Sequence, residues 1–196
     1  ADNILIFMTG PTAGTAAPAG GRFVVVSKSP LTGIYGSSFC GGRFGVGLKR
    51  AGYDGLIVRG GSETPVNIRI DENQVLIEDA SAYWGIDTYD FQEELKDLGD
   101  WAVIGPAGEN QVRFAGIVSD KRIAGRCGFG AVMGSKNLTG IVAKGKKRIV
   151  VADANGFKKA LKKAQLKVKN HPVTGQNLPK IGTPANVMIY GAAGVM

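Results

Sequence analysis

The chain has 196 residues, which is enough for one large domain or for one domain and part of a second. Hydrophobic residues make up 44% and charged residues 20%, which argues against intrinsic disorder, and no apolar run approaches the ~18 residues of a membrane span. Two Cys and one His exclude a disulfide framework and a His-cluster metal site, and they fit a reducing compartment. Two numbers remain unusual: 30 residues are Gly, about double the usual share, and the net charge is +8.

The first half of the chain predicts strands, one short helix and a hairpin. Buried strands are expected at residues 4–8 and 22–27, and a further strand at 56–59. Residues 41–51 predict a short helix, because Phe44, Leu48 and Ala51 share one face. Apolar residues alternate on both sides of Asp-Glu-Asn at 71–73, so residues 66–77 predict a β-hairpin.

The second half predicts a helix that starts at Thr88 and ends at Gly99. Its strands are expected at residues 101–105, 112–119, 139–143 and 148–152. The segment after Pro172 is expected to be rich in turns and to belong to the next structural unit.

The positive charge is concentrated in one block. Residues 144–169 contain ten Lys or Arg and one Asp, and the remainder of the chain is nearly neutral. Asp153 is a candidate cap for a helix that runs to about residue 169, with Phe157 and Leu161 on its apolar stripe. Its other faces carry five lysines, Lys158, Lys159, Lys162, Lys163 and Lys167. Such a face is either solvated or binds an acidic partner such as nucleic acid.

The glycines belong to an internal repeat. Gly-Pro, Arg-Phe, Ser, Phe-Gly and Gly-x-(Ile/Val)-x-x-Gly occur in this order twice, and the last two elements recur at an offset of 85 residues. This offset pairs the loop at residues 39–42 with the loop at 124–127, each of which opens a short helix. Free N–H groups at helix N-termini suit phosphate, and Arg22 and Arg126 could add bidentate contacts. The alternative is that the glycines only relieve crowding in two tight turns.

Standard catalytic and nucleotide-binding motifs are absent. The dinucleotide fingerprint fails at Arg50 and at Met133, where it needs glycine, and Gly134-Ser-Lys does not have the order of a P-loop. No nucleophile elbow accompanies the single histidine, His171.

Five motifs together carry a resemblance. They are Gly-Pro-Thr-Ala-Gly-Thr at 10–15, Ser-Pro-Leu-Thr-Gly at 29–33, Leu-Lys-Arg-Ala-Gly-Tyr-Asp-Gly at 48–55, Ile-Gly-Pro-Ala-Gly-Glu-Asn at 104–110 and Gly-Ala-Val-Met-Gly-Ser-Lys-Asn at 130–137. In this order they resemble the N-terminal domain of the tungsten-containing aldehyde:ferredoxin oxidoreductases, over nearly the whole chain.

The resemblance implies an enzyme that oxidises aldehydes to carboxylic acids and passes electrons to ferredoxin. It implies a tungsten bis-pterin cofactor (tungstopterin) with magnesium between the pterin phosphates. The four-iron four-sulfur cluster would lie in later domains, because two isolated cysteines cannot hold it. It further implies a cytoplasmic protein that can form a homo-oligomer, with no nucleic acid or membrane as partner.

The resemblance also suggests site residues. Arg22 would contact the pterin, and the main-chain carbonyls of Phe39 and Ala124 would bind the magnesium. The candidate cofactor-binding set is Arg22, Phe39, Cys40, Gly41, Gly42, Ala124, Gly125 and Arg126. No catalytic residue is expected in this chain, which alone should be inactive.

The expected fold is α+β and rich in β-structure, with two mainly antiparallel sheets related by a pseudo-twofold duplication and a few short helices. Residues 1–152 are expected to form the cofactor-cradling domain, with halves at about 1–85 and 100–145, and residues 153–196 to begin the following domain. Two other functions stay open: a basic nucleic-acid-binding module and a cofactor-free structural relative.

Overall fold

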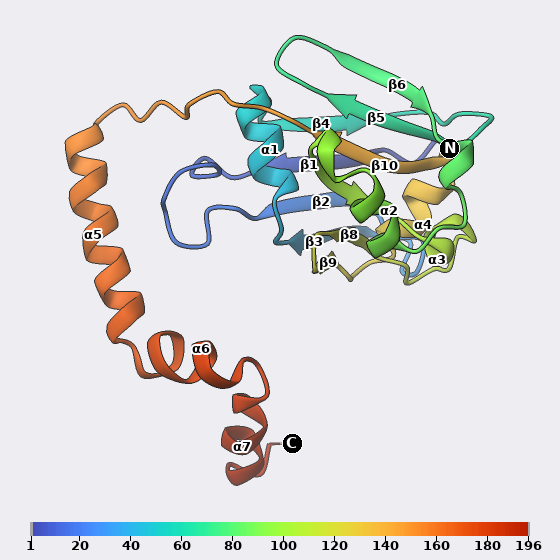
Figure 1. Cartoon of the computed structure of the whole chain (residues 1–196). Coiled ribbons are helices and arrows are strands. Elements are labelled where there is room, and N and C mark those ends of the chain that lie inside the picture. Colours follow the sequence, from blue (N-terminus) through green and yellow to red (C-terminus); the bar gives the residue numbers. More distant parts are fainter. Residues whose placement is uncertain (1, 196) are drawn as a thin grey trace. The chain divides into compact units, whose positions relative to one another are not determined.

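The computed structural model describes residues 2–195, which fall into two compact units. The first unit runs to Ile149 and contains both β-sheets, and the second runs from Val150 onward and is helical (Figure 1). Within the described residues, no helix is long and apolar enough to cross a membrane.

The first sheet has four strands in the order β3-β2-β1-β4, all antiparallel. They are β1 (Leu5–Thr9), β2 (Phe23–Lys28), β3 (Tyr35–Cys40) and β4 (Gly55–Val58). The β-branched run in β2 favours a strand, and alternate residues of β1 and β2 face the core. Strand β3 was not predicted, because Tyr-Gly-Ser-Ser-Phe-Cys lacks an apolar alternation.

The second sheet has six strands in the order β6-β5-β10-β7-β8-β9. They are β5 (Val66–Ile70), β6 (Val75–Asp79), β7 (Asp100–Val103), β8 (Ile117–Ser119), β9 (Arg122–Ala124) and β10 (Leu138–Ala143). All neighbours are antiparallel except β10 and β5, which run parallel. The predicted hairpin is therefore confirmed as β5 and β6, and it extends the second sheet.

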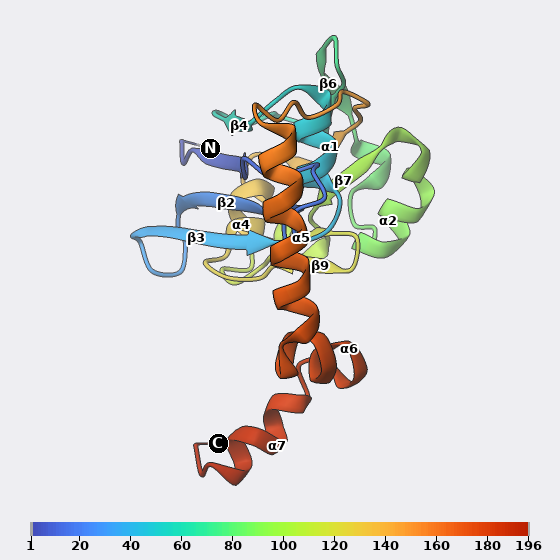
Figure 2. The ribbon, with the colours of Figure 1, turned by 90° about the vertical axis from the view of Figure 1, so that its left-hand side faces the viewer.

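The main core contains buried side chains from both sheets and from two short helices, α1 (Phe44–Ala51) and α4 (Phe129–Gly134). Phe44 of α1 packs edge-on against Phe7 of β1 and Phe23 of β2, with ring centroids 5.9 and 5.1 Å apart. On the outer face of the second sheet, α2 (Thr88–Glu94) covers a smaller cluster around Phe91 and Trp101. Figure 2 shows α2 and the strands β2 and β3 on opposite sides of the unit.

Strand order and register confirm the internal repeat, although two of its five sequence elements are not at equivalent positions. Phe23 is equivalent to Ile117 and not to Phe114, and Ser27 is not equivalent to Ser119. The order β3-β2-β1-β4 recurs as β9-β8-β7-β10, and each of these pairs is antiparallel. Leu5 pairs with Val58, and their counterparts 95 and 85 residues later, Asp100 and Ala143, pair in the same way. Helices α1 and α4 begin 85 residues apart, as the sequence predicted. The α+β prediction with two related, mainly antiparallel sheets is confirmed.

Two predicted strands differ in the structure. Residues 112–119 contribute only the short β8, because the Ala115 N–H donates to the Val112 carbonyl and closes a turn before the strand. Residues 148–152 form no strand, since this apolar run has no neighbouring strand in the described chain and Val150 is 89% exposed. A short helix, α3 (Pro106–Glu109), follows β7 and was not predicted.

The second unit begins with the expected basic helix, α5 (Ala154–Asn170), which Asp153 caps by accepting a hydrogen bond from the Gly156 N–H. The expectation of a turn-rich segment after Pro172 is wrong. Residues Pro172–Asn177 form a π-helical turn, followed by α6 (Leu178–Ile181) and α7 (Ala185–Ala192). The imidazole of His171 accepts hydrogen bonds from the Val173 and Thr174 N–H groups, so the single histidine has a structural role at the start of that turn.

Candidate cofactor-binding site

The two repeats meet where β3 and β9 lead into their helices. The Arg126 N–H donates to the Ser38 hydroxyl at 3.1 Å, and the Cys127 thiol lies 3.9 Å from the Ser37 carbonyl. At the other end of the same strand pair, a Cβ on Gly41 would lie 3.2 Å from the Arg122 side chain. Each loop therefore packs against the edge strand of the other repeat.

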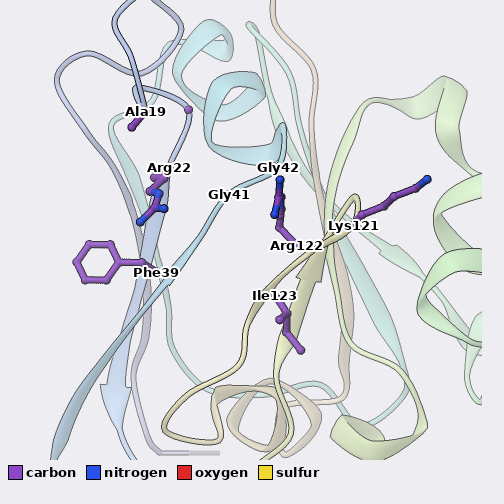
Figure 3. Close-up of a pocket in the computed structure, with 9 residues that line it drawn as sticks. Ala19, Arg22, Phe39, Gly41, Gly42, Lys121, Arg122 and Ile123 are labelled. Atoms are coloured by element: carbon purple, nitrogen blue, oxygen red, sulfur yellow. The ribbon is translucent and has the colours of Figure 1, made fainter. Parts of the chain in front are cut away.

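A pocket of about 630 Å³ opens at this junction. Figure 3 shows Arg22 and Phe39 on one side, Lys121, Arg122 and Ile123 on the other, and the backbone of Gly41 and Gly42 between them. The lining is completed by Ala19 and Gly21. A second pocket of about 400 Å³ shares Ala19, Arg22 and Phe39 with the first, so the hollow continues along the first sheet.

The charge of the pocket is positive. Arg22, Lys121 and Arg122 line it, and its lining includes no Asp or Glu. In the described chain, no carboxylate forms an ion pair with any of these three side chains. Arginine offers a planar fork of donors that matches phosphate, and lysine adds a point charge. The lining therefore presents cationic donors of a kind that suits an anion, and Phe39 and Ile123 add apolar surface, being 63% and 55% exposed.

Gly42 is required by the contact between the repeats. Its φ of +82° lies in the left-handed region that favours glycine, and a Cβ there would lie 2.5 Å from the Ser119 hydroxyl oxygen. For this glycine, relief of crowding is the interpretation that the structure supports. The neighbouring Phe44 N–H donates to the same hydroxyl at 3.4 Å, which ties the start of α1 to the end of β8.

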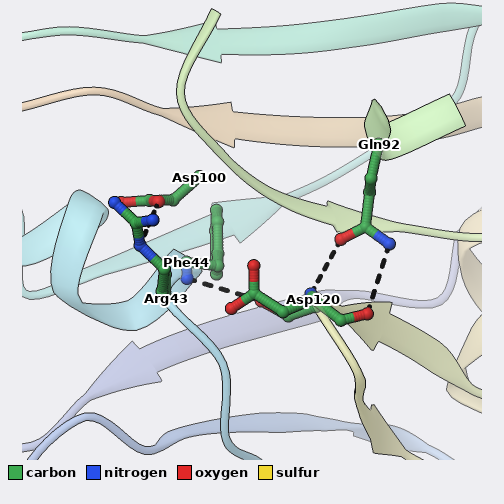
Figure 4. A network of polar contacts seen from close by, with 6 residues as sticks. Arg43, Phe44, Gln92, Asp100 and Asp120 are labelled. Atoms are coloured by element: carbon green, nitrogen blue, oxygen red, sulfur yellow. Dashed lines mark hydrogen bonds and ion pairs between the residues drawn. The ribbon is translucent and has the colours of Figure 1, made fainter. Parts of the chain in front are cut away.

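A polar network holds both sides of the junction (Figure 4). Arg43 lies 3.0 Å from the Asp100 carboxylate on β7, and this carboxylate is only 22% exposed. Burial raises the pKa of Asp100 above its usual value, although the Arg43 guanidinium opposes that change. The Asp120 N–H donates to the Gln92 amide oxygen at 2.7 Å, so α2 fixes the β8–β9 turn that carries Lys121.

Of the eight residues expected at the site, Arg22, Phe39, Gly41 and Gly42 line the pocket. The remaining four, Cys40, Ala124, Gly125 and Arg126, do not. Cys40 and Ala124 are buried and face the core, whereas Gly125 and Arg126 are exposed beyond β9. Burial raises the pKa of the Cys40 thiol to about 11, partly offset by N–H groups of Ser119 and Ala124, so it stays protonated at neutral pH.

The pairing of the two loops differs by one residue from the sequence prediction. Phe23 pairs with Cys40 in the first sheet, and its counterpart Ile117 pairs with Ala124 in the second. Ala124 is therefore equivalent to Cys40, and Ile123, not Ala124, is equivalent to Phe39. The second loop holds one extra residue before its helix, which restores the offset of 85 at Phe129. An alignment that allowed this insertion would have found Ile123, whereas Lys121 and Arg122 are equivalent to Ser37 and Ser38, which were not candidates.

The described residues contain no cluster of three or more His, Cys, Asp or Glu side chains that could hold a metal ion. Any metal near this pocket would depend on main-chain oxygens or on an organic ligand.

Comparison with known proteins identifies the family. Residues 1–145 match the model of the aldehyde ferredoxin oxidoreductase N-terminal domain. The chain belongs to this family. It is 48% identical over 200 aligned residues to the tungsten-containing aldehyde ferredoxin oxidoreductase of Pyrococcus horikoshii, an alignment that covers 99% of this chain and 33% of that protein. The chain thus spans about a third of the length of the curated relatives it matches.

Two other similar proteins carry different names. The aliphatic sulfonate oxidoreductase WOR-like subunit of Pyrococcus furiosus is 38% identical over 162 residues, which covers 74% of this chain and 26% of that protein. Among solved structures, the active site complex BamBC of benzoyl coenzyme A reductase in complex with 1,5-dienoyl-CoA aligns with a TM-score of 0.80 and 37% identity. That alignment covers 85% of this chain and 26% of the other, so the two chains share this fold.

Proposed function

We propose that this chain is the cofactor-binding N-terminal domain of a tungsten enzyme that oxidises aldehydes to carboxylic acids with ferredoxin as electron acceptor. The observation that carries the proposal is the positive pocket where the repeats meet, in a chain whose relatives are named tungsten-containing aldehyde ferredoxin oxidoreductases.

The donor set of the pocket fits a cofactor with phosphate groups. Arg22, Lys121 and Arg122 supply cationic donors without a competing carboxylate in the lining. Phe39 and Ile123 supply apolar surface on the two sides, as an organic ring system would need. When bound, a tungsten bis-pterin would supply the two-electron redox chemistry. The role of this chain is to bind the phosphates, to orient the ring systems, and to keep both sides of the pocket fixed through the Arg43–Asp100 pair and the Gln92–Asp120 hydrogen bonds.

We also propose a magnesium ion, which the main-chain carbonyls of Phe39 and Ala124 would hold and which would offset the negative charge of the cofactor phosphates. Carbonyl oxygen is a ligand that this hard cation accepts. Because the register makes Ile123 the counterpart of Phe39, the two proposed carbonyls occupy non-equivalent positions in the repeats.

The other components are assigned to the remainder of the full-length polypeptide. The four-iron four-sulfur cluster, the aldehyde pocket and the ferredoxin contact would lie there. Cys40 is buried with a raised pKa, which makes it a poor cluster ligand. A cytoplasmic location and a homo-oligomer belong to the same proposal.

The experiment is to purify the full-length protein and to measure its tungsten and pterin content together with aldehyde-dependent reduction of a viologen dye. We expect bound tungsten and turnover in the full-length protein and no turnover by residues 1–196 alone. A full-length protein without tungsten and pterin would instead favour a cofactor-free relative, and an absence of Cys-x-x-Cys motifs in the rest of its gene would agree with that reading.

One observation favours a second candidate function, a nucleic-acid-binding module. No residue of α5 is buried, and its lysines form an exposed basic face. No aromatic side chain alternates with these lysines, so the helix offers no side chain suited to recognise nucleic-acid bases. A salt titration of binding to duplex DNA and to RNA tests this function. A steep salt dependence that is lost when Lys158, Lys159, Lys162 and Lys163 become Ala would support it.

A further inference from the structure

Helix α5 separates its charged residues from its apolar residues. All six of its lysines are exposed, and a rotation of about 100° per residue places them in two neighbouring rows along one side of the helix. We call these rows the lysine face, which consists of Lys158, Lys162 and Lys169 in one row and Lys159, Lys163 and Lys167 in the other. The half-buried Phe157, Leu161 and Ala164 lie on the opposite side.

Nothing in the described residues neutralises the lysine face. Helix α5 contains no Asp or Glu, and none of the ion pairs within residues 2–195 involves its lysines. Three pairs of these lysines are four residues apart, and like charges at that spacing destabilise a helix. The lysine face therefore lowers the stability of its own helix unless an acidic surface lies against it.

The side of α5 opposite the lysine face suits contact with the remainder of the full-length polypeptide. Among the described residues, neither hydrophobic core includes any part of α5. Phe157 and Leu161 are four residues apart and form an apolar stripe that only a further element can bury. Because lysine is almost never buried without a partner, packing through the stripe leaves the lysine face in water.

We propose that the lysine face of α5 is the docking surface for an acidic electron-carrier protein, the ferredoxin that accepts the electrons of aldehyde oxidation. This inference rests on the proposed function. One aldehyde and one water give a carboxylate, three protons and two electrons, so a one-electron carrier must bind and leave twice in each turnover. Long-range attraction between opposite charges speeds such encounters and does not need the large interface that would slow release.

The composition of the lysine face favours carboxylates of a protein over nucleic acid. Arginine forks and stacking aromatic rings are the usual means of holding nucleic acid, and the lysine face has neither. The step from Lys158 to Lys169 covers about 16 Å along the helix axis. A contact of that length matches the small interfaces of transient redox encounters.

The test is aldehyde-dependent electron transfer by the full-length protein, with an acidic ferredoxin or a viologen dye as acceptor. The first variant replaces Lys158, Lys159, Lys162 and Lys163 by Gln. Its KM for ferredoxin should rise by roughly 10-fold or more, because charge steering raises association rates by at least that factor. Its kcat with ferredoxin and its rate with viologen should stay unchanged, since docking is not needed for either.

A matched control removes the same charge from scattered positions. It replaces four exposed cations outside α5 by Gln: Lys28, Arg59, Arg148 and Lys180. Its KM for ferredoxin should change little. An equal KM in the two variants overturns the proposal. Added salt should raise the KM of the unsubstituted protein much more than that of the first variant, because screening acts only where the charges remain.

A second measurement separates docking from the proposed function. Absence of turnover with either acceptor in the unsubstituted full-length protein refutes the proposed function, and carbodiimide cross-linking to the acidic ferredoxin then decides docking. This reagent joins lysine amines to carboxylates in contact with them, so the cross-linked peptides should come from residues 154–170. It also decides if the first variant does not fold. Cross-links confined to other lysines overturn the proposal. Binding of duplex DNA that the first variant loses, with its KM for ferredoxin unchanged, also overturns it and identifies nucleic acid as the partner.

Discussion

Replacement of Gly42 by Ala tests whether the two repeats touch as the structure shows. An L-residue in the left-handed region costs about 1–2 kcal/mol, and Gly42 has φ +82°. The new Cβ would lie 2.5 Å from the Ser119 hydroxyl oxygen and 2.6 Å from its carbonyl oxygen, and such overpacking costs a further ~1–3 kcal/mol. The free energy of unfolding should therefore fall by about 2–5 kcal/mol.

The assay is thermal unfolding of the two variants Gly42→Ala and Gly60→Ala beside the unsubstituted protein. At roughly 2–4 °C per kcal/mol for a domain of this size, Gly42→Ala should lower the melting temperature by about 4–20 °C. Gly60 has φ +68°, but no atom lies within 4 Å of the place that a Cβ would take, so its Ala variant isolates the backbone cost and should lose only ~2–8 °C. Equal losses in the two variants would refute the close contact between Gly42 and Ser119.

Three further predictions follow from single side chains. Iodoacetamide at pH 8 should label the half-buried Cys127 before Cys40, because the Cys40 thiol is buried and its pKa is raised to about 11. Peptide mapping would show the order of labelling, and both cysteines should react in urea. Earlier labelling of Cys40 would contradict its burial. Ionisation of a carboxyl whose pKa is raised in the folded state lowers the stability of the protein, so Asp100→Asn should gain stability relative to the unsubstituted protein as the pH rises from 4 to 7. Urea unfolding of both proteins at the two pH values measures this difference in the free energy of unfolding. An opposite trend would show that the Arg43 pair outweighs burial. Asp153→Ala should reduce the helical circular dichroism signal of α5, because loss of the cap costs about 1 kcal/mol, whereas Asp153→Asn should keep most of the signal. An unchanged signal in Asp153→Ala would mean that the cap is not formed.

Much of the fold was predictable from local patterns. The β5–β6 hairpin has alternating apolar residues around a polar turn, and the helices after both glycine loops follow from the repeat. The sheet that receives the hairpin was not predictable, because the parallel pairing of β5 with β10 joins residues about 70 positions apart and leaves no local signal.

The site was predictable only in part. Arg22, Phe39, Gly41 and Gly42 could be selected from the first repeat. On the second repeat, an ungapped offset of 85 selects Ala124, whereas the strand register places Ile123 opposite. A one-residue shift exchanges the two faces of a strand, so the exposed position was replaced by a buried one. Lys121 and Arg122 were missed because their counterparts in the first repeat, Ser37 and Ser38, carry no charge and gave no signal.

The central claim is that the positive pocket at the junction of the repeats holds a phosphate-bearing tungsten cofactor. The most direct measurement is tungsten and pterin per polypeptide in the purified full-length protein and in two variants. Loss of both arginines in Arg22→Ala/Arg122→Ala removes charge-assisted contacts worth about 1.5–3 kcal/mol each, so the variant should retain at most a tenth of the cofactor. Arg148→Ala, an exposed position outside the pocket, should retain it in full. Equal tungsten and pterin content in all three proteins would contradict the assignment of this pocket.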